Sequence, residues 1–320
     1  METRRIDNRF SRILVQYAFI VVQALPALVP VTGTKTRRNA NMTRQDHQEN
    51  SGEATISGVE SDEKAARPDP LFNQSLEKGL EVLRAFSAVH RTLTLAELAG
   101  LTGMTKSSAQ RTVHTLETLG YVAKHPQTRR FRLTPKVMEI GYNYLCADAL
   151  IQVASPYLSQ LANASGETAN LTEPVGLEMV YVAQLMTSKY IPVLTPVGMR
   201  IPMYCTSSGR AYLSTLPDDE VMAMLEDSAR VARTPATLTD VAAIFETVVA
   251  CRKVGYACNN EELFLGDMGV GAAIVNSQGQ AVGAVHVSPP ASRWSMAEAQ
   301  KKLAPMVIEC AWAISRSIAH

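Results

Sequence analysis

The sequence predicts an α+β protein, with a winged helix-turn-helix followed by connecting helices and a second, larger α/β domain. Three observations carry this prediction. Residues 75–134 have the pattern of three helices and a hairpin, residues 135–165 continue as helix, and strands rich in β-branched and aromatic residues begin at Glu167. The length of 320 residues suits two domains.

Residues 1–70 are expected to lie outside both domains. The apolar run Ile13–Pro30 approaches the length of a membrane span, but glutamines and prolines interrupt it. From Met42 to Pro70 the chain is polar and typical of disorder. The run is therefore a signal-anchor, part of a disordered arm, or an over-extended reading frame whose true start is Met42. Mass spectrometry of the native N-terminus separates these alternatives.

Three helices are predicted between residues 75 and 120. Ser75 is the expected N-cap of the first, which has leucines and a phenylalanine at helical spacing. Thr94 and Glu97 form a capping box for the second, which ends at Gly100 or Gly103. The third begins after Thr105 and ends near Gly120. Its core-facing residues are expected to be Ala109, Val113, Leu116 and Leu119.

A hairpin should follow the third helix, because residues 121–134 alternate around a turn at Pro126–Thr128. The short connection between the second and third helices is typical of a helix-turn-helix, and the hairpin is its wing. The predicted domain boundaries are 71–135 for the winged helix, 136–157 for the connecting helices and 158–320 for the second domain.

Basic residues are concentrated on the third helix and the wing, although the formal net charge of the chain is only +1. Between Thr105 and Arg132 there are six lysines and arginines and one acidic residue, Glu117. Such local clustering favours phosphate contacts, and Gln and Arg side chains can pair with base edges. A solvated helix face with a charged hairpin is the alternative. The expected DNA-binding residues are Thr105, Lys106, Ser107, Ser108, Gln110, Arg111, His114, Arg129 and Arg130.

The second domain has predicted strands at 167–175, 177–186, 190–197, 255–263, 269–277 and 281–288. Helices are expected at about 206–215, 218–227, 239–254 and 295–317. Asn276–Gly279 is a turn between the last two strands. The stretch "GDMGVG" is not a dinucleotide-binding fingerprint, because its glycine spacing is wrong and no helix follows it.

The chain also resembles a known family. The stretch "SLEKGLEVLRAF…TLAELAGLTGMTKSSAQRTVHTLETLGYV…RRFRLTPKVMEIGYNYL" looks like the winged helix of IclR-type bacterial transcriptional regulators. Downstream, "MRIPMYCTSSGRAYLSTLP" and "GYACNNEELFLGDMGVGAAIVNSQGQAVGAVHVSPPASR" resemble the ligand-binding domain of that family. The resemblance covers about residues 72–318. Pro289 and Ile274 depart from the family pattern, at positions where glycine, and cysteine or proline, are usual.

This resemblance implies a GAF-like effector-binding domain, dimers or tetramers, and control by small organic or aromatic acids. Each effector candidate also has a structural interpretation: His286 as a core histidine, Met199 as packing, and Glu261 and Glu262 as a solvated strand end. The candidate effector-binding residues are Met199, Tyr204, Thr206, Ser207, Glu261, Asp267, Ile274, His286 and Ser288.

The expected function is a ligand-responsive, DNA-binding transcriptional regulator of a catabolic operon, acting in the cytoplasm as a homodimer or homotetramer on an operator. Its alternatives are a small-molecule sensor that acts through protein partners and, less favoured, a GAF-like enzyme. No base or orienting residue marks Cys205 as a nucleophile. No metal, cofactor or stable membrane partner is expected, and the 5 cysteines include no C-x-x-C pair.

Overall fold

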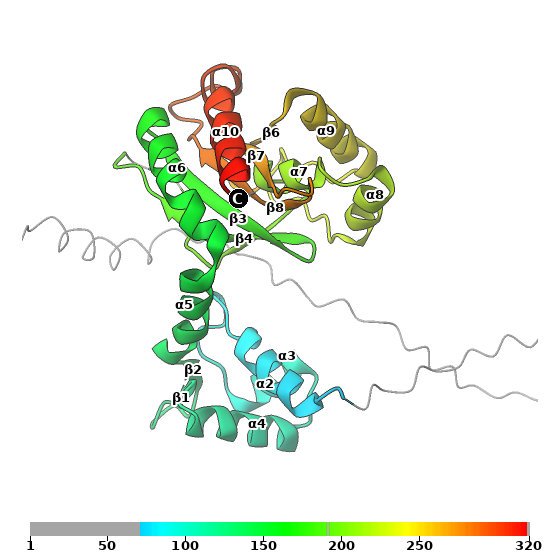
Figure 1. Ribbon diagram of the computed structural model, residues 1–320. Helices are drawn as coiled ribbons and strands as arrows, with labels where there is room; N and C mark the ends of the chain where they lie inside the picture. Colours follow the sequence, from blue (N-terminus) through cyan, green and yellow to red (C-terminus); the bar gives the residue numbers. More distant parts are fainter. Residues whose placement is uncertain (1–70, 190, 192, 319–320) are drawn as a thin grey trace, which may run out of the picture. The chain divides into compact units, whose positions relative to one another are not determined.

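The computed structural model describes residues 71–189, 191 and 193–318, and these fall into two units divided after Val137 (Figure 1). The expectations for residues 1–70, including the apolar run, lie outside the described residues. In the part of the chain that the structure describes, no helix is long and apolar enough to span a membrane.

The first unit is the predicted winged helix-turn-helix. Its elements are α2 (Gln74–Ala85), α3 (Leu95–Thr102), α4 (Lys106–Thr118), β1 (Val122–Lys124), β2 (Phe131–Leu133) and a final 3₁₀ turn, Pro135–Val137. β1 and β2 pair in antiparallel register. The three helices and the hairpin share one apolar core, in which Val82, Leu98 and Val113 are completely or almost completely buried.

Two of the three predicted helix starts in this unit are confirmed. In the capping box, the Glu97 amide donates to Thr94 Oγ1 (3.2 Å) and the Thr94 amide donates to Glu97 Oε2 (2.7 Å). α3 ends at Gly103, which adopts φ 66° in the left-handed region that glycine tolerates. Thr105 is the N-cap of α4.

Two local predictions in this unit are wrong. The N-cap of α2 is Asn73 rather than Ser75, because the Asn73 side-chain oxygen accepts hydrogen bonds from the amides of Ser75 and Leu76. Leu119 does not reach the core: α4 ends at Thr118, so Leu119 is its C-cap and its side chain is 52% exposed.

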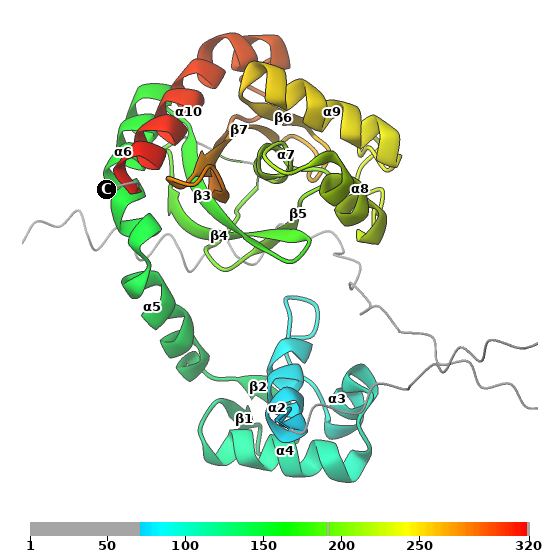
Figure 2. The same ribbon diagram turned by 45° about the vertical axis from the view of Figure 1, so that its right-hand side comes forward.

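The second unit is built on one six-stranded antiparallel sheet of order β5-β4-β3-β8-β7-β6 (Figure 2). The strands are β3 (Thr168–Val175), β4 (Glu178–Leu185), β5 (Arg200–Pro202), β6 (Ala257–Asn260), β7 (Met268–Val275) and β8 (Ala281–Ser288). The helices are α5 (Met138–Ala147), α6 (Ala149–Ser165), α7 (Ser207–Leu213), α8 (Asp218–Asp227), α9 (Val241–Val254) and α10 (Met296–Ile318). The predicted α/β architecture is confirmed.

The strand predicted over residues 190–197 is wrong. Its described residues form no strand, and the chain instead turns at Pro196–Gly198 before β5. Met199 donates its amide to the Pro196 carbonyl (3.0 Å), and Gly198 takes φ 88°. Pro196 has no amide hydrogen to give to a neighbouring strand, so the apolar residues around it do not extend the sheet.

The two faces of the sheet bury two separate cores, with α6 and α10 on one face and α7, α8 and α9 on the other (Figure 2). Alternation along each strand decides which face a side chain joins. On β8, Val285 and Val287 pack toward α6 and α10, whereas Ala284 and His286 face the side of α7. The sheet thus separates the candidate site residues into two groups.

Candidate DNA-binding surface and effector site

The outer face of α4 carries the predicted DNA-binding side chains. Lys106, Gln110, Arg111 and His114 are all exposed, because the opposite face of the helix buries Ala109, Val113 and Leu116. In the first turn, Thr105 Oγ1 accepts from the Ser108 amide (3.3 Å) and contacts the exposed Ser107 hydroxyl (3.2 Å). The helix therefore presents one polar, cationic surface to solvent, as a recognition helix requires.

The two arginines of the wing have different environments. Arg129 is exposed and adopts φ 55°, a conformation that non-glycine residues rarely take. Arg130 folds back onto the segment before α3: its Nη2 donates to Glu97 Oε2 (2.8 Å) and to the Thr92 carbonyl (2.8 Å). Its Nε also donates to Thr92 Oγ1 (3.0 Å). Arg130 is thus held within its own domain.

A polar cluster lies in the second unit, on the face of the sheet that α7 covers. Gln184 Nε2 donates to Asn170 Oδ1 and to Thr195 Oγ1, both at 2.9 Å. Asn170 Nδ2 in turn donates to Ser288 Oγ (3.2 Å). Asn170 is completely buried and pairs across the sheet with His286 and Gln184. Of these residues the sequence analysis singled out only Ser288 and His286. The signal it missed was a buried asparagine inside an apolar strand.

His286 is the most unusual member of this cluster. Its side chain is 3% exposed, and its ring meets the Tyr181 ring edge-on with centroids 5.4 Å apart. Burial lowers the pKa of His286 to about 3, so the ring is neutral at physiological pH. Its Nδ1 is buried without a hydrogen-bond partner within the described residues. A buried nitrogen of this kind favours a ligand or water that completes its hydrogen bonding.

The start of α7 lies against His286. A Cβ added at Gly271 would stand 3.1 Å from the Ser208 nitrogen and 3.2 Å from the His286 Cβ, so the glycine permits this close approach. The hydroxyl of Ser208 is also buried and unpartnered within the described chain. Thr206 is already satisfied, since its hydroxyl donates to the Pro202 carbonyl (2.7 Å) and accepts from the Gly209 amide (3.2 Å). The Ser207 amide donates to Asn259 Oδ1 (3.2 Å).

The remaining predicted effector residues divide between two faces of the sheet. Burial raises the pKa of Tyr181, and the charge of nearby Asp267 raises it further, so Asp267 lies close to the ring that contacts His286. Met199 packs beside the same cluster, and its carbonyl accepts from the Tyr181 amide (3.0 Å). Ile274 is fully buried on the opposite face, in the core under α6 and α10, so the structure does not bring it to His286.

Tyr204 and Glu261 are occupied by local contacts. The Tyr204 hydroxyl donates to the Val231 carbonyl (2.7 Å), toward the loop between α8 and α9. Glu261 Oε2 accepts the Gly266 amide (2.6 Å), and Glu261 itself has φ 55°. The first contact holds the loop between α8 and α9, and the second shapes the loop before β7.

Glu262 is not the solvated strand end that the sequence suggested. Its carboxylate makes a bidentate ion pair with Arg210 of α7, with oxygen–nitrogen distances of 2.7 and 2.6 Å. The exposed fractions of the two side chains are 2% for Arg210 and 7% for Glu262. Arg210 also donates to the carbonyls of Tyr204 and Cys258, both at 3.1 Å. The pair fixes α7 to the loop after β6, beside the candidate effector site.

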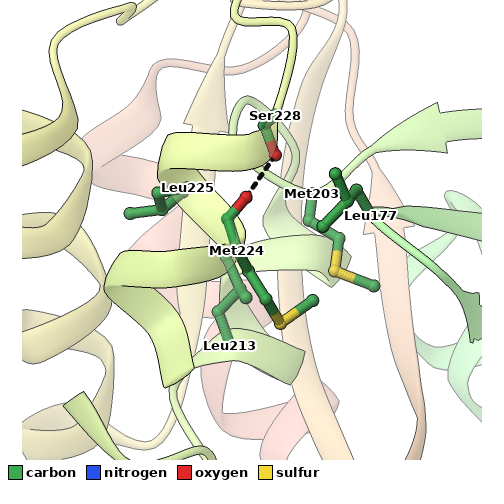
Figure 3. A pocket seen from close by; sticks show the side chains of 6 residues that line it. All are labelled: Leu177, Met203, Leu213, Met224, Leu225 and Ser228. Carbon is green, nitrogen blue, oxygen red and sulfur yellow. Dashed lines mark hydrogen bonds between the residues drawn. The ribbon is translucent and has the colours of Figure 1, made fainter. Parts of the chain in front are cut away.

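A shallow, mostly apolar pocket lies elsewhere on the α7 side (Figure 3). It is lined by Leu177, Met203, Leu213, Met224, Leu225 and Ser228. The only hydroxyl among these residues donates to the Met224 carbonyl at 2.7 Å, as the dashed line in Figure 3 shows. None of the predicted effector residues lines this pocket, and it offers a polar ligand little to bind.

The pKa of Asp267 predicts that the stability of the folded protein depends on pH. Burial raises the pKa of Asp267 from 3.8 to about 7. Because the folded-state pKa is raised, its contribution to stability is fully present below about 3.8 and is lost as the pH rises through about 7. We therefore expect Asp267→Asn to gain stability over the wild type as the pH rises.

This is measured by urea denaturation of both proteins at pH 5 and pH 8. Glu309→Gln, an exposed carboxylate on α10, controls for the loss of one negative charge. A difference between Asp267→Asn and the wild type that does not change with pH would contradict the prediction.

The two units match two family models. Residues 75–126 match the IclR helix-turn-helix domain, and residues 142–316 match the bacterial transcriptional regulator IclR C-terminal domain. The Pca regulon regulatory protein of Pseudomonas putida is 32% identical over 253 residues, which are 79% of this chain and 85% of that protein.

Solved structures agree. A putative transcriptional regulator from Rhodococcus sp. RHA1 is 35% identical with a TM-score of 0.66, and the match covers 78% of this chain and 99% of that one. An IclR homolog from Microbacterium hydrocarbonoxydans, complexed with 4-hydroxybenzoate, shares the fold with 19% identity and a TM-score of 0.63 over 76% of this chain and 98% of that one. The chain therefore belongs to the IclR family of bacterial transcriptional regulators, with an N-terminal DNA-binding domain and a C-terminal effector-binding domain.

Proposed function

We propose that α4 enters the major groove of an operator and that Gln110 and Arg111 read base edges there. The observation that carries this proposal is the exposed polar face of α4 between its N-cap and His114. Gln pairs with adenine and Arg with guanine in the major groove. Lys106, Ser107 and the backbone amides of the first turn contact phosphates, and His114, later on the helix, contacts phosphate rather than a base.

We further propose that the protein acts as a homodimer or a homotetramer, in the cytoplasm where the operator lies. Leu76 and Leu80 on α2 are 63% and 44% exposed. None of the residues of α5 is buried, although seven of the ten in its sequence "MEIGYNYLCA" are apolar or aromatic. A second copy that covers such surfaces places two copies of α4 on two operator half-sites.

The polar cluster around His286 is the proposed effector site. Two buried atoms, His286 Nδ1 and Ser208 Oγ, have no hydrogen-bond partner among the described residues, and this supports a ligand that completes their hydrogen bonding. A solved structure with the same fold is a complex with 4-hydroxybenzoate, and this supports a small aromatic or organic acid as the effector. We therefore propose that the protein controls a catabolic operon for such acids.

A thermal-shift screen of aromatic and aliphatic acids, with 4-hydroxybenzoate included, tests the effector site. We expect at least one acid to raise the melting temperature, and His286→Phe to weaken its binding by about tenfold or more, since a lost hydrogen bond to a buried group costs about 1–3 kcal/mol. Ile274→Val is the matched control, because Ile274 lies on the opposite face of the sheet. It should lower the melting temperature slightly and leave the dissociation constant unchanged. Equal ligand affinities for wild type and His286→Phe would refute this assignment.

A sensor that acts through protein partners is the second candidate function. Selection of duplexes from a random oligonucleotide pool separates this function from DNA binding, because a protein-binding winged helix enriches no sequence.

An enzymatic role is disfavoured by the state of Cys205. Burial raises the pKa of its thiol to about 12, so the thiol holds its proton at neutral pH.

A further inference from the structure

Arg129 and Arg130 are adjacent in the wing, but their side chains have different environments. We propose that Arg130 does not contact DNA but is a positioning residue, which anchors the wing to the start of α3 so that Arg129 reaches the phosphate backbone. This inference rests on the proposed DNA-binding role of the winged helix. It assigns the two arginines separate tasks that their sequence positions do not distinguish.

The base of the wing pairs with the segment that precedes α3. Leu93 and Phe131 form an isolated antiparallel bridge, in which the Leu93 amide donates to the Phe131 carbonyl (2.9 Å) and the Phe131 amide donates to the Leu93 carbonyl (2.7 Å). Leu93 is 2% exposed and Phe131 is 6% exposed, so the bridge lies over the core. The base of β2 is thereby held against the chain that leads into α3.

Arg130 reinforces this attachment from the neighbouring position. Two of its three guanidinium nitrogens donate to Thr92 and Glu97, at 2.8–3.0 Å. The Glu97 oxygen that it contacts, Oε2, is the same oxygen that accepts the Thr94 amide in the capping box of α3. The hydrogen bonds from Thr94 and Arg130 also lower the pKa of Glu97, so the carboxylate is charged where it faces the arginine. Because Glu97 already compensates the charge of Arg130, this arginine is not available to neutralise a phosphate and to release a counterion from the DNA.

The environment of Arg129 differs from that of Arg130. Its amide donates to the His125 carbonyl (2.9 Å), which closes the turn of the wing and holds φ at 55°. Among the described residues no side chain pairs with its guanidinium, and the residue is exposed. Arg129 is therefore the arginine of the wing whose charge is available to a phosphate.

The salt dependence of DNA binding separates a phosphate contact from a positioning role. The full-length protein is titrated with a duplex selected from a random pool and with its scrambled version, at several salt concentrations. For each phosphate contact removed, the slope of log K against log salt falls by about 0.9. We expect Arg129→Ala to lower the slope by about this amount on both duplexes.

Arg130→Ala should leave the slope unchanged, because the wing still brings Arg129 to its phosphate in the bound state. It should weaken binding to the selected duplex by about tenfold, because a wing without the hydrogen bonds of Arg130 has to be ordered when it binds. Glu97→Gln is the second variant. Gln at this position keeps the capping box but not the ion pair, so it should also weaken binding, although it removes a negative charge near the DNA. Effects of the two changes should be less than additive in the double variant.

A slope for Arg130→Ala that falls as much as that for Arg129→Ala would overturn the proposal, and so would tighter binding by Glu97→Gln. Circular dichroism and melting temperatures verify that each variant is folded. The proposed role of α4 fails separately, if Arg111→Ala binds the selected duplex as tightly as the wild type.

Discussion

Glu262→Gln is expected to destabilise the effector domain by about 3–5 kcal/mol, because it leaves the guanidinium of Arg210 buried without its counter-charge. Both side chains are nearly inaccessible to solvent, and the bidentate contact joins α7 to the loop after β6. The amide of a glutamine fits the same space but carries no charge. The loss should appear as a lower midpoint in urea denaturation followed by circular dichroism.

The matched control is Glu178→Gln, which removes the partner of Arg200 on the edge strand β5. That pair is also short, with 2.6 Å between Arg200 Nε and Glu178 Oε2, but its side chains are 49% and 30% exposed. Solvent screens it, so we expect a loss of about 0–1 kcal/mol. The double variant Arg210→Met/Glu262→Met should be more stable than Glu262→Gln, since no charge is left buried. Similar losses for Glu262→Gln and Glu178→Gln would show that the buried pair has no special role.

This contrast shows what periodicity can and cannot predict. The sequence predicted α3 and its capping box, because both depend on residues three positions apart. It could not pair Arg210 with Glu262, which are 52 positions apart in sequence. Two adjacent glutamates after a strand look solvated, and only the packing of α7 on the sheet shows that one of them is buried.

The candidate effector site shows the same limit. His286 and Ser288 were predicted, and they do lie at one polar cluster, but Asn170 and Gln184 were missed because strand pairing brings them there. Ile274 was grouped with them from its place in a family-like motif. Alternation along β7 instead directs its side chain to the other face, and this depends on a strand register that the sequence analysis did not assign.

The surface of α4 is where sequence and structure agree most closely. Three of the four residues that were expected to face the core are buried in α4. The expected DNA-facing residues Lys106, Gln110 and Arg111 are all exposed. The prediction that Leu119 faces the core is wrong because this residue follows the last residue of α4. The helical period was reliable up to that point, since it is a local property of the chain.

That agreement makes the base-reading residues the sharpest test of function. We expect Arg111→Ala and Gln110→Ala each to weaken binding to the selected duplex by about 1–3 kcal/mol, or about 5- to 150-fold, and to weaken binding to a scrambled duplex much less. Both residues are exposed on the surface of α4, so their removal leaves its core contacts intact. Fluorescence anisotropy with both duplexes, at several salt concentrations, measures the two affinities.

Lys253→Ala is the control for simple loss of positive charge, because Lys253 is exposed on α9 in the effector-binding domain. It should leave the ratio of specific to non-specific affinity unchanged. Loss of a phosphate contact lowers the affinity for both duplexes alike, whereas loss of a base contact lowers the ratio of specific to non-specific affinity. If Arg111→Ala and Gln110→Ala reduced both affinities equally, α4 would be bound to the DNA backbone, and the sequence of the operator would have to be read by another part of the domain.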